Sequence, residues 1–509
     1  MDGVPLLSQQ LVAPGEVFKY EFLAHPAGTH FYHTHVAQLG LRGPFIVRAK
    51  IDPHRSLYDS DETVVFLSDL CKSMDESTWL AGLVAGTLMS DEDPESDLDW
   101  EDTALLCNGV LCESASINIS AGSDRPRLRL INGAFNWAVV VSVDQHDLLI
   151  LASDGKDVVA RSASELVVSP GERYDVVLIP RRGAERGGGG EGGGGGGGGE
   201  AKRHAFRLST RNGHHVVASL WYEASSGGGE TEEVSKKVAL RTSDHVKYLD
   251  LSYNVSLLRS HSMTTPLMPM VASRTMDMHL SGSMMEYAWS IDGTTWPAMD
   301  VEIDIPLAVL RGQFTGDVRQ AIKQVTLNEV VDIQIHNPTG MQHPFHLHGH
   351  KFWVLGSRSL IIGKQTSPMV EIESNVWYAY KDTINVPPGR VISIRVEFDN
   401  PGPWLFHCHT SFHLARGMAV VFMVGNEEEQ PVPPSNPMGQ EIQDFWSLML
   451  VMAVFMLGAV VGIACGCSAY WYPNQCPSHR CKGYKSVLDN DDLVEMTPVE
   501  VDESVVGEI

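Results

Sequence analysis

Short runs in which apolar and polar residues alternate recur along most of this chain. Alternation with a period of two places apolar side chains on one face of a β-strand, and Gly, Asn or Pro, which favour turns, end several of the runs. The runs expected to form strands are residues 127–133, 137–143, 147–153, 165–169, 174–180, 324–337 and 390–398. Because almost nothing before residue 446 carries a long helical period, the pattern predicts an all-β fold of sandwiches or barrels.

Two segments depart from this pattern. Residues 187–199 are twelve glycines and one glutamate, which cannot bury apolar area to offset the entropy of ordering them, so we expect a flexible loop between two strands. Residues 446–470 run for 25 positions without a charge. About 20 apolar residues cross the hydrocarbon core of a bilayer, so this segment is expected to form one C-terminal transmembrane helix.

The charges beside the apolar segment predict its orientation. Arg480, Lys482 and Lys485 follow it closely, whereas the twenty residues before it contain no Lys or Arg. The positive-inside rule therefore places residues 473–509 in the cytoplasm and everything before the helix outside. The expectation is a single-pass plasma-membrane protein with an extracellular N-terminal region, a Pro-rich stalk over 426–445 and a cytoplasmic C-terminal tail.

Composition narrows the class of protein. Lys and Arg total 38 against 63 for Asp and Glu, a formal net charge of −25. This balance argues against a nucleic-acid partner, because nucleic-acid binders carry a basic face or arm. The 21 histidines are more informative, since ten of them fall in three short clusters. That clustering points to metal chemistry.

The cysteines, the glycosylation sequons and the N-terminal residues indicate whether the protein is extracellular. Cys107 and Cys112 flank an Asn-Gly turn signal, and a short disulfide across a hairpin and two free thiols both fit this spacing. Asn118 and Asn254 stand in N-glycosylation sequons, which fits a surface glycoprotein. However, the opening residues MDGVPLLSQQ have neither the basic start nor the apolar core of a signal peptide, which an ectodomain needs.

The C-terminal histidine cluster reads FHCHTSFHLARGM and ends at Met418. Side chains alternate faces on a strand, so His407 and His409 point one way and Cys408 points the other. His413 and Met418 follow the cysteine by five and ten residues. One thiolate, imidazoles and a distant thioether are the ligands of a blue-copper site. Zinc is the weaker alternative, because a closed tetrahedral zinc site gives no reason for histidines on the opposite face.

Two further clusters supply histidine pairs at strand spacing. In HPFHLHGH, His346 and His348 share a face, whereas His343 stands earlier and is available to a different metal. In GTHFYHTHV, His33 and His35 again share a face. A single pair of this kind arises easily by chance. Three clusters, one of them with a cysteine between two histidines, make chance a poor explanation.

These motifs resemble three of the four copper-binding signatures of the multicopper oxidases, the family of laccases, ferroxidases and ascorbate oxidase. The likeness covers most of residues 1–425, where MDGVPLLSQ, AGTHFYHTH, FLSDL, LRLINGAFNW, SPGERYDVVL and the two later clusters follow in family order. The spacing of the final cluster is highly specific. A membrane-anchored laccase-like protein of the invertebrate type is the likeness that these segments indicate.

The resemblance implies cupredoxin-like β-sandwich domains. Residues 1–52 would be the C-terminal part of a truncated first domain, residues 60–225 the second domain with the insert 187–199, and residues 245–425 the third. In this family a trinuclear copper cluster lies between the first and third domains. That location agrees with ligands drawn from residues 33–35 and 343–409.

The resemblance also implies copper ligands. It assigns His343, Cys408 and His413 to a type 1 copper, with Met418 as the axial neighbour. The ligands that it implies for the trinuclear cluster are His33 and His409 for one type 3 copper, His35, His348 and His407 for the other, and His346 for the type 2 copper.

The function implied is copper-dependent oxidation with dioxygen as the electron acceptor. In the family mechanism, electrons enter at the type 1 copper and pass through Cys408 to His407 and His409, and dioxygen is reduced to water at the trinuclear cluster. The expected reducing substrates are phenols, catechols or aromatic amines. Ferrous iron is the alternative, for which Asp154, Glu371 and Asp382 are candidate carboxylates, although surface or turn roles are the better explanation of all three.

One departure from the family qualifies this expectation. The first signature, a His-Trp-His-Gly type of motif, should lie just upstream of the segment that resembles MDGVP, which here is the start of the sequence. The type 2 copper and one type 3 copper would then be incompletely liganded. We expect that the sequence is an incomplete version of a longer secretory protein and that, as written, it reduces dioxygen poorly or not at all. The alternative is a non-catalytic copper-binding surface protein.

Overall fold

The computed structural model of the chain describes residues 3–4, 7–8, 12, 15, 17–35, 41–59, 63–71, 103–120, 123–181, 202–210, 215–223, 245–283, 288–296, 320–360, 376–426 and 428–430. These residues are almost entirely strands and turns. The all-β prediction is therefore confirmed. The predicted domain bounds remain predictions.

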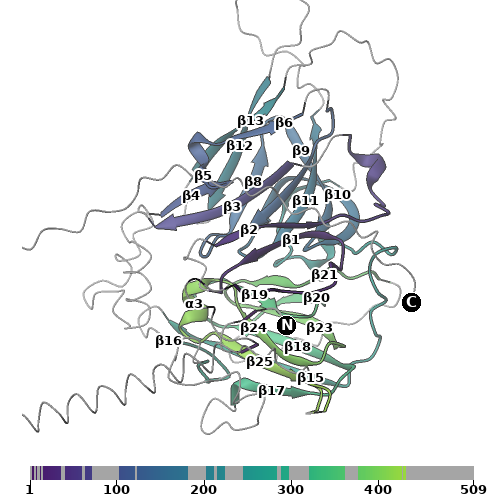
Figure 1. Cartoon of the computed structure of the whole chain (residues 1–509), viewed down its shortest axis with the longest axis vertical. Coiled ribbons are helices and arrows are strands. Elements are labelled where there is room, and N and C mark those ends of the chain that lie inside the picture. Colours follow the sequence, from purple (N-terminus) through teal and green to yellow (C-terminus); the bar gives the residue numbers. More distant parts are fainter. Residues whose placement is uncertain are drawn as a thin grey trace, which may run out of the picture.

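The first element is an antiparallel hairpin of β1 (Gly28–His33) and β2 (Arg42–Val47). It lies between the large sheet and the C-terminal sheets (Figure 1). Gly28 has a φ of +145°, and a Cβ built on it would lie 2.3 Å from the carbonyl oxygen of Gly155. Only glycine allows this approach, and it brings β1 against the turn that follows β9.

The large sheet contains twelve of the described strands. Along the sheet they run in the order β5-β4-β3-β7-β11-β9-β10-β8-β12-β13-β6, and β14 pairs with β10. Their bounds are β3 (Thr63–Cys71), β4 (Thr103–Cys107), β5 (Val110–Leu111), β6 (Ser116–Ile119), β7 (Arg127–Asn132), β8 (Val139–Val143), β9 (His146–Ser153), β10 (Lys156–Val168), β11 (Arg173–Pro180), β12 (Lys202–Thr210), β13 (His215–Tyr222) and β14 (His245–Leu249).

The C-terminal strands form two sheets. One has the order β16-β15-β18-β23-β20-β21 and the other β17-β25-β24-β19-β22. Their bounds are β15 (Arg274–Ser283), β16 (Ala288–Ile291), β17 (Ile322–Val325), β18 (Glu329–Asn337), β19 (His343–Leu347), β20 (Phe352–Ser359), β21 (Tyr380–Lys381), β22 (Thr383–Val386), β23 (Arg390–Phe398), β24 (Gly402–Cys408) and β25 (Ala419–Val424).

The two C-terminal sheets share one hydrophobic core. Ile333 of β18 and Ile394 of β23 belong to the same buried cluster as Phe406 of β24 and Phe422 of β25. Packing of apolar faces from two sheets is the arrangement of a β-sandwich. One short α-helix, α3 (Ser411–Ala415), lies between β24 and β25, and three-residue 3-10 turns occur at η2 (Arg55–Leu57), η4 (Cys112–Ser114) and η6 (Val255–Leu257).

The alternation of apolar and polar residues predicted most strands well. One predicted strand differs from the structure, and the cause is a single residue. Residues 390–398 form β23 with the predicted bounds. The run 324–337 is instead divided into β17 and β18. Asn328, between the two strands, has a φ of +65°, a left-handed conformation that Asn tolerates and that ends a strand.

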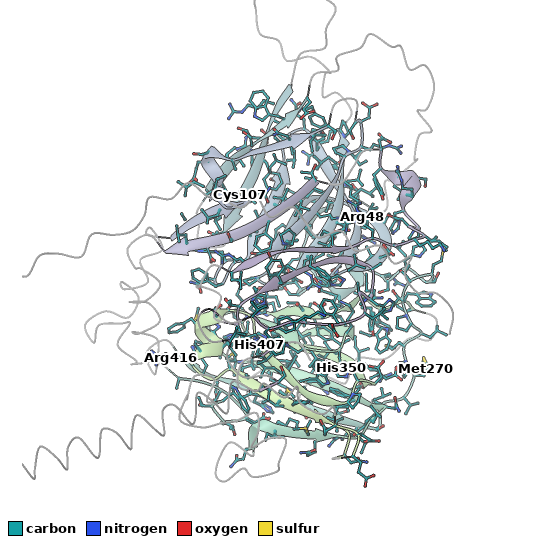
Figure 2. All side chains as sticks on the ribbon, viewed as in Figure 1. Arg48, Cys107, Met270, His350, His407 and Arg416 are labelled. Carbon is teal, nitrogen blue, oxygen red and sulfur yellow. A yellow bond between two sulfur atoms is a disulfide. The ribbon has the colours of Figure 1, made fainter. Side chains whose placement is uncertain are left out.

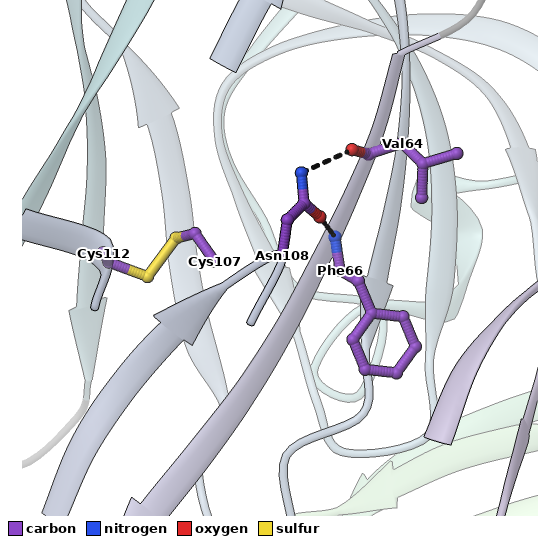
Figure 3. The surroundings of a disulfide bond; sticks show 5 residues. All are labelled: Val64, Phe66, Cys107, Asn108 and Cys112. Carbon is purple, nitrogen blue, oxygen red and sulfur yellow. Dashed lines mark hydrogen bonds between the residues drawn. A yellow bond between two sulfur atoms is a disulfide. The ribbon is translucent and has the colours of Figure 1, made fainter. Parts of the chain in front are cut away.

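The two alternatives for Cys107 and Cys112 are resolved by a disulfide between them. It joins the end of β4 to the turn η4 (Figure 3). Between the cysteines, the Asn108 side chain accepts a hydrogen bond from the Phe66 amide (2.7 Å) and donates one to the Val64 carbonyl (3.0 Å). These bonds attach the hairpin to β3.

The predicted membrane topology needs correction. No helix among the described residues is long and apolar enough to cross a membrane. The α-helix α3 has five residues, about 7.5 Å of helix, against a hydrocarbon core of about 30 Å. This finding overturns the predicted single-pass location in the plasma membrane. The segments predicted as transmembrane helix (446–470), cytoplasmic tail (473–509) and glycine-rich loop (187–199) lie outside the described residues.

Candidate metal centre

Strand β24 places the Cys-flanking histidines. It lies between β25 and β19, and all seven of its residues are buried. In the pairing with β19, His346 stands opposite His407, and Phe345 stands opposite Cys408. Alternation along the strand therefore gives the thiol and the preceding imidazole opposite faces, as the sequence predicted. Figure 2 labels His407 among the C-terminal strands.

The first group of candidate ligands is His343, Cys408 and His413. Cys408 Sγ lies 3.4 Å from His413 Nδ1 and 3.8 Å from His343 Nδ1, and the two ring nitrogens are 3.0 Å apart. All three residues are buried. Metal–nitrogen bonds of about 2.0 Å and metal–sulfur bonds of about 2.3 Å give separations of this size around a single ion.

Hydrogen bonds orient this first group. His343 Nε2 lies 2.8 Å from the Thr339 hydroxyl, so Nδ1 is the nitrogen directed at the cysteine. The Met418 amide donates to the His413 carbonyl (2.9 Å), and the Cys408 amide donates to the Met418 carbonyl (3.1 Å). Met418 is itself fully buried. The backbone thus holds the methionine beside the group, where the sequence predicted an axial ligand.

Burial makes this group suited to a cation. It raises the pKa of the Cys408 thiol to about 12 and lowers the pKa of His413 to about 3. Burial also lowers the pKa of His343 well below its usual range, with a further contribution from His413. Two neutral imidazoles with facing nitrogens and a thiol that does not ionise alone match a site whose charge is supplied by a metal.

Trp289 was not predicted as part of the site. Its ring centroid lies 4.4 Å from that of His413 and 5.0 Å from that of His343, and the residue is 1% exposed. It packs against both ligands, at an interplanar angle of 68° to His343 and 49° to His413. Nothing in the local pattern of β16 indicated this role, because contact with residues 343–413 depends on how the two C-terminal sheets pack.

The second group brings together His35, from the start of the chain, and His348 and His407, which lie more than 300 residues later. His348 Nε2 lies 3.2 Å from His35 Nε2 and 3.0 Å from His407 Nε2. His407 Nδ1 donates to the Cys408 carbonyl (2.9 Å), so its Nε2 is directed at the other rings. Two nitrogens on one metal cannot lie more than about 4 Å apart, and these distances meet that limit.

Three further histidines surround this trio. The His33 ring lies 5.1 Å from His409, and His346 lies 4.8 Å from His348, between ring centroids. The rings of His346 and His409 are 5.9 Å apart. All six candidate trinuclear ligands therefore gather in one region, which joins the hairpin β1–β2 to the sheet of β19 and β24.

The surroundings of His409 support a metal at this second group. Its Nδ1 is buried and has no hydrogen-bond partner among the described residues. Gly171, at a φ of +84°, leaves room for the ring, because a Cβ there would lie 2.6 Å from His409 Cδ2. Burial and the neighbouring imidazoles of His33 and His346 hold the pKa of His409 well below its usual range. A neutral imidazole with an unpaired buried nitrogen is suited to metal ligation.

A buried ion-pair network adjoins His346, and the sequence did not reveal it. His346 Nδ1 donates to the Asp382 carbonyl (2.9 Å). The Asp382 carboxylate accepts hydrogen bonds from both terminal nitrogens of the Arg173 guanidinium (2.6 and 2.8 Å) and from the Lys351 ammonium (2.5 Å). Burial opposes the charge on Asp382, yet Arg173 and Lys351 hold its pKa well below the usual range. Because Arg173 belongs to β11, this network joins the large sheet to the C-terminal sheets.

The carboxylates considered for iron have other partners. Asp154 is fully buried and pairs with Lys381 (3.0 Å), while Asp382 pairs with Arg173 and Lys351. Asp154 does lie in a turn, between β9 and β10, but both carboxylates are held by buried cations and neither is free for a ferrous ion. Glu371 lies outside the described residues.

Comparisons with known proteins agree with this geometry. Family models described as "Multicopper oxidase" match residues 1–52, 62–183 and 273–428. Laccase-2 of Pleurotus ostreatus is 28% identical over 433 residues, which cover 83% of this chain and 73% of that protein. The laccase of Trametes hirsuta is 27% identical over 484 residues, which cover 87% of this chain and 79% of that protein.

Solved structures show the same fold. The laccase from Botrytis aclada superposes with a TM-score of 0.61 at 22% identity, covering 85% of this chain and 76% of that one. Fet3p, described as a multicopper oxidase that functions in iron import, gives a TM-score of 0.61 at 20% identity, covering 83% and 77%. With the matched models, they establish the cupredoxin-like architecture. The chain belongs to the multicopper oxidase family of copper-dependent enzymes, and the two sequence relatives reported above are laccases.

Proposed function

We propose that this chain oxidises phenols, catechols or aromatic amines and delivers their electrons to dioxygen, which is reduced to water. The ligands proposed for the type 1 copper are His343, Cys408 and His413, with Met418 as the axial neighbour. Those proposed for the type 2 and type 3 coppers are His33, His35, His346, His348, His407 and His409.

The observation that carries the proposal is the direct covalent link between the two groups. Cys408 lies in the first group, and the flanking residues His407 and His409 lie in the second. A hydrogen bond from the His407 ring to the Cys408 carbonyl shortens this connection further. Two metal sites joined through three consecutive residues are arranged for electron transfer between a substrate and a distant oxidant.

The side chains around each group fix ring orientation, and those of the first group are fully buried. Bound copper supplies one-electron transfer at the first group and dioxygen reduction at the second. Trp289 packs against His343 and His413, while Asp382 holds the ring of His346. Four one-electron oxidations of an organic substrate, with four protons, balance the conversion of one dioxygen to two waters.

Organic substrates are favoured over ferrous iron. The relatives with the highest identities reported above are laccases. Fet3p shares the fold, but the carboxylates that we considered for an iron site here, Asp154 and Asp382, are held in buried ion pairs. Ferrous oxidation therefore remains the second candidate.

The test compares the copper-loaded chain with its Cys408→Ser variant. We expect the parent to show blue visible absorption and only slow catechol-dependent oxygen uptake, because the first copper signature is missing from the sequence as written. The variant should lose both while keeping its far-UV circular dichroism. The serine removes the thiolate whose bond to copper gives the colour. Copper content and electron paramagnetic resonance identify which sites remain loaded.

Each outcome has a defined meaning. Blue colour that survives Cys408→Ser would show that the type 1 assignment is wrong. A blue parent chain that takes up no oxygen with any reductant would support the copper-binding alternative. Oxygen uptake with ferrous iron but not with catechols or aromatic amines would support the ferroxidase.

A further inference from the structure

A second kind of histidine cluster lies on the sheet that contains β15 and β18. His279 and His336 stand opposite each other on these parallel strands, and Asp277 is two residues before His279 on the same face. On the other side of β15, Asp292 follows the end of β16. None of these residues belongs to the two copper-ligand groups described above.

The side chains of this cluster already contact one another. The His279 and His336 rings stack with centroids 4.5 Å apart and planes 20° apart. His336 Nε2 lies 2.8 Å from Asp277 Oδ1, and His279 Nδ1 lies 3.5 Å from Asp292 Oδ1. Two stacked imidazoles thus lie beside two carboxylates, with His336 buried and the His279 and Asp277 side chains exposed.

Asp292 lies beside His279 and is positioned by a backbone amide and a lysine. It accepts a hydrogen bond from the His279 amide (2.9 Å) and pairs with Lys323 (3.1 Å). A carboxylate behind one ring nitrogen of a histidine orients the other nitrogen toward a metal and increases its basicity. Nε2 of His279 is then the nitrogen available for a ligand bond.

The remaining side chains have the freedom to close on an ion. The side chains of His279 and Asp277 are 61% and 54% exposed, whereas that of His336 is 6% exposed. Two exposed ligands beside one buried ligand can rotate onto a cation without moving core atoms. The 2.8 Å separation of His336 Nε2 and Asp277 Oδ1 also suits adjacent ligands with metal bonds of about 2.0–2.1 Å.

We propose that Asp277, His279 and His336 form a surface site for a divalent first-row transition-metal cation, with Asp292 as the supporting carboxylate. Two imidazoles and one carboxylate favour ions such as Zn²⁺, Ni²⁺ or Cu²⁺ over the hard cations Mg²⁺ and Ca²⁺. The site is independent of the proposed oxidase function, because its ligands are separate from Cys408 and the clustered histidines.

The test uses Zn²⁺, which has no redox chemistry. The full copper-loaded chain, freed of excess copper, is titrated with Zn²⁺ by isothermal calorimetry, and Mg²⁺ is titrated in parallel. We expect a Zn²⁺ binding event that His279→Ala weakens at least ten-fold and that Asp277→Asn weakens as well, with no corresponding event for Mg²⁺. Both substitutions are at exposed positions, so the variants should fold even if His336→Ala does not.

The matched control is His215→Ala, at an exposed histidine on β13 of the large sheet. It should leave the Zn²⁺ affinity unchanged. Cys408→Ser should also retain the event, so failure of the oxidase proposal is distinguishable from failure of this one. Equal Zn²⁺ affinity in the parent, His279→Ala and Asp277→Asn chains, or no Zn²⁺ event in the parent, would overturn the proposal.

Discussion

The two groups of candidate copper ligands are assembled in different ways. His343, Cys408 and His413 all belong to the C-terminal part of the fold, on β19, β24 and α3, and are all buried. The second group requires His35 to meet His348, which is 313 residues away in the sequence, and His35 is only partly buried. The first group therefore depends on strand pairing within one sandwich, whereas the second depends on how the hairpin β1–β2 docks against it.

The largest effects should separate the two groups directly. We expect His413→Ala to abolish the blue absorption, because it removes a ligand from the cysteine group. His35→Ala should keep the blue absorption but lower copper content and reduce oxygen uptake at least ten-fold. Visible absorption, copper analysis and oxygen electrode measurements on both copper-loaded variants check this prediction. If His35→Ala removes the colour, the groups are not independent.

A smaller effect should come from the ion pairs that join the sheets. Asp382→Asn removes the nearest counter-charge of the buried Arg173 and Lys351, so that Arg173 keeps only the more distant Asp154 carboxylate (3.7 Å). Breaking a buried pair in this way costs about 3–5 kcal/mol. We expect a lower free energy of unfolding in urea and disturbed copper binding at the second group, while the folded fraction keeps its blue colour.

The control for this variant is an equally well-formed pair on the surface. Arg207 contacts Asp144 through two hydrogen bonds of 2.6 and 2.8 Å, but both side chains are exposed. Arg207→Ala should change the free energy of unfolding by no more than about 1 kcal/mol. Equal losses in the two variants would show that burial does not decide the strength of the Asp382 network.

Acid should weaken the docking of the β1–β2 hairpin. Burial, followed by the charges of Arg173 and Lys351, lowers the pKa of His30 to about 3, whereas the unfolded value is about 6.5. The unfolded chain takes up a proton first, so this contribution to stability is complete above pH 6.5 and is lost as the pH falls toward 3. Between pH 6.5 and 5 the loss is about 2 kcal/mol at most.

Urea unfolding of the parent and His30→Gln chains at several pH values checks this prediction. The variant cannot take up the proton, so its free energy of unfolding should fall less steeply with acid. Parallel curves for the two chains would mean that His30 does not carry the effect.

The smallest effect on the metal centres should come from the disulfide. Replacing both Cys107 and Cys112 with serine opens a short loop, and loop-closure entropy gives a loss of about 2 kcal/mol in unfolding free energy. The hairpin belongs to the large sheet rather than to either ligand group. Visible absorption and copper content should therefore match the parent, and a loss of either would show coupling across the sheet.

Much of the fold and the site could be predicted from local patterns. The run 390–398 formed β23 because its alternation matches a strand with a buried face. The opposite faces of His407 and Cys408 followed from the same alternation. The predicted plasma-membrane location is overturned, since no helix among the described residues is long and apolar enough to cross a membrane. The sequence could not show that Asp154 and Asp382 are held in buried ion pairs, because those pairs depend on contacts between sheets.

The sequence by itself determined the all-β class and the chemical types of the metal ligands, because strand periodicity and ligand spacing are local properties. It also predicted that Cys408 points to one face of its strand and that the flanking His407 and His409 point to the other. Only the tertiary structure decided that Trp289 packs against the first group, that Arg173 reaches Asp382 beneath His346, and that His279 stacks on His336. Such contacts join residues far apart in the chain, and their distances are set by sheet packing, which no local pattern encodes.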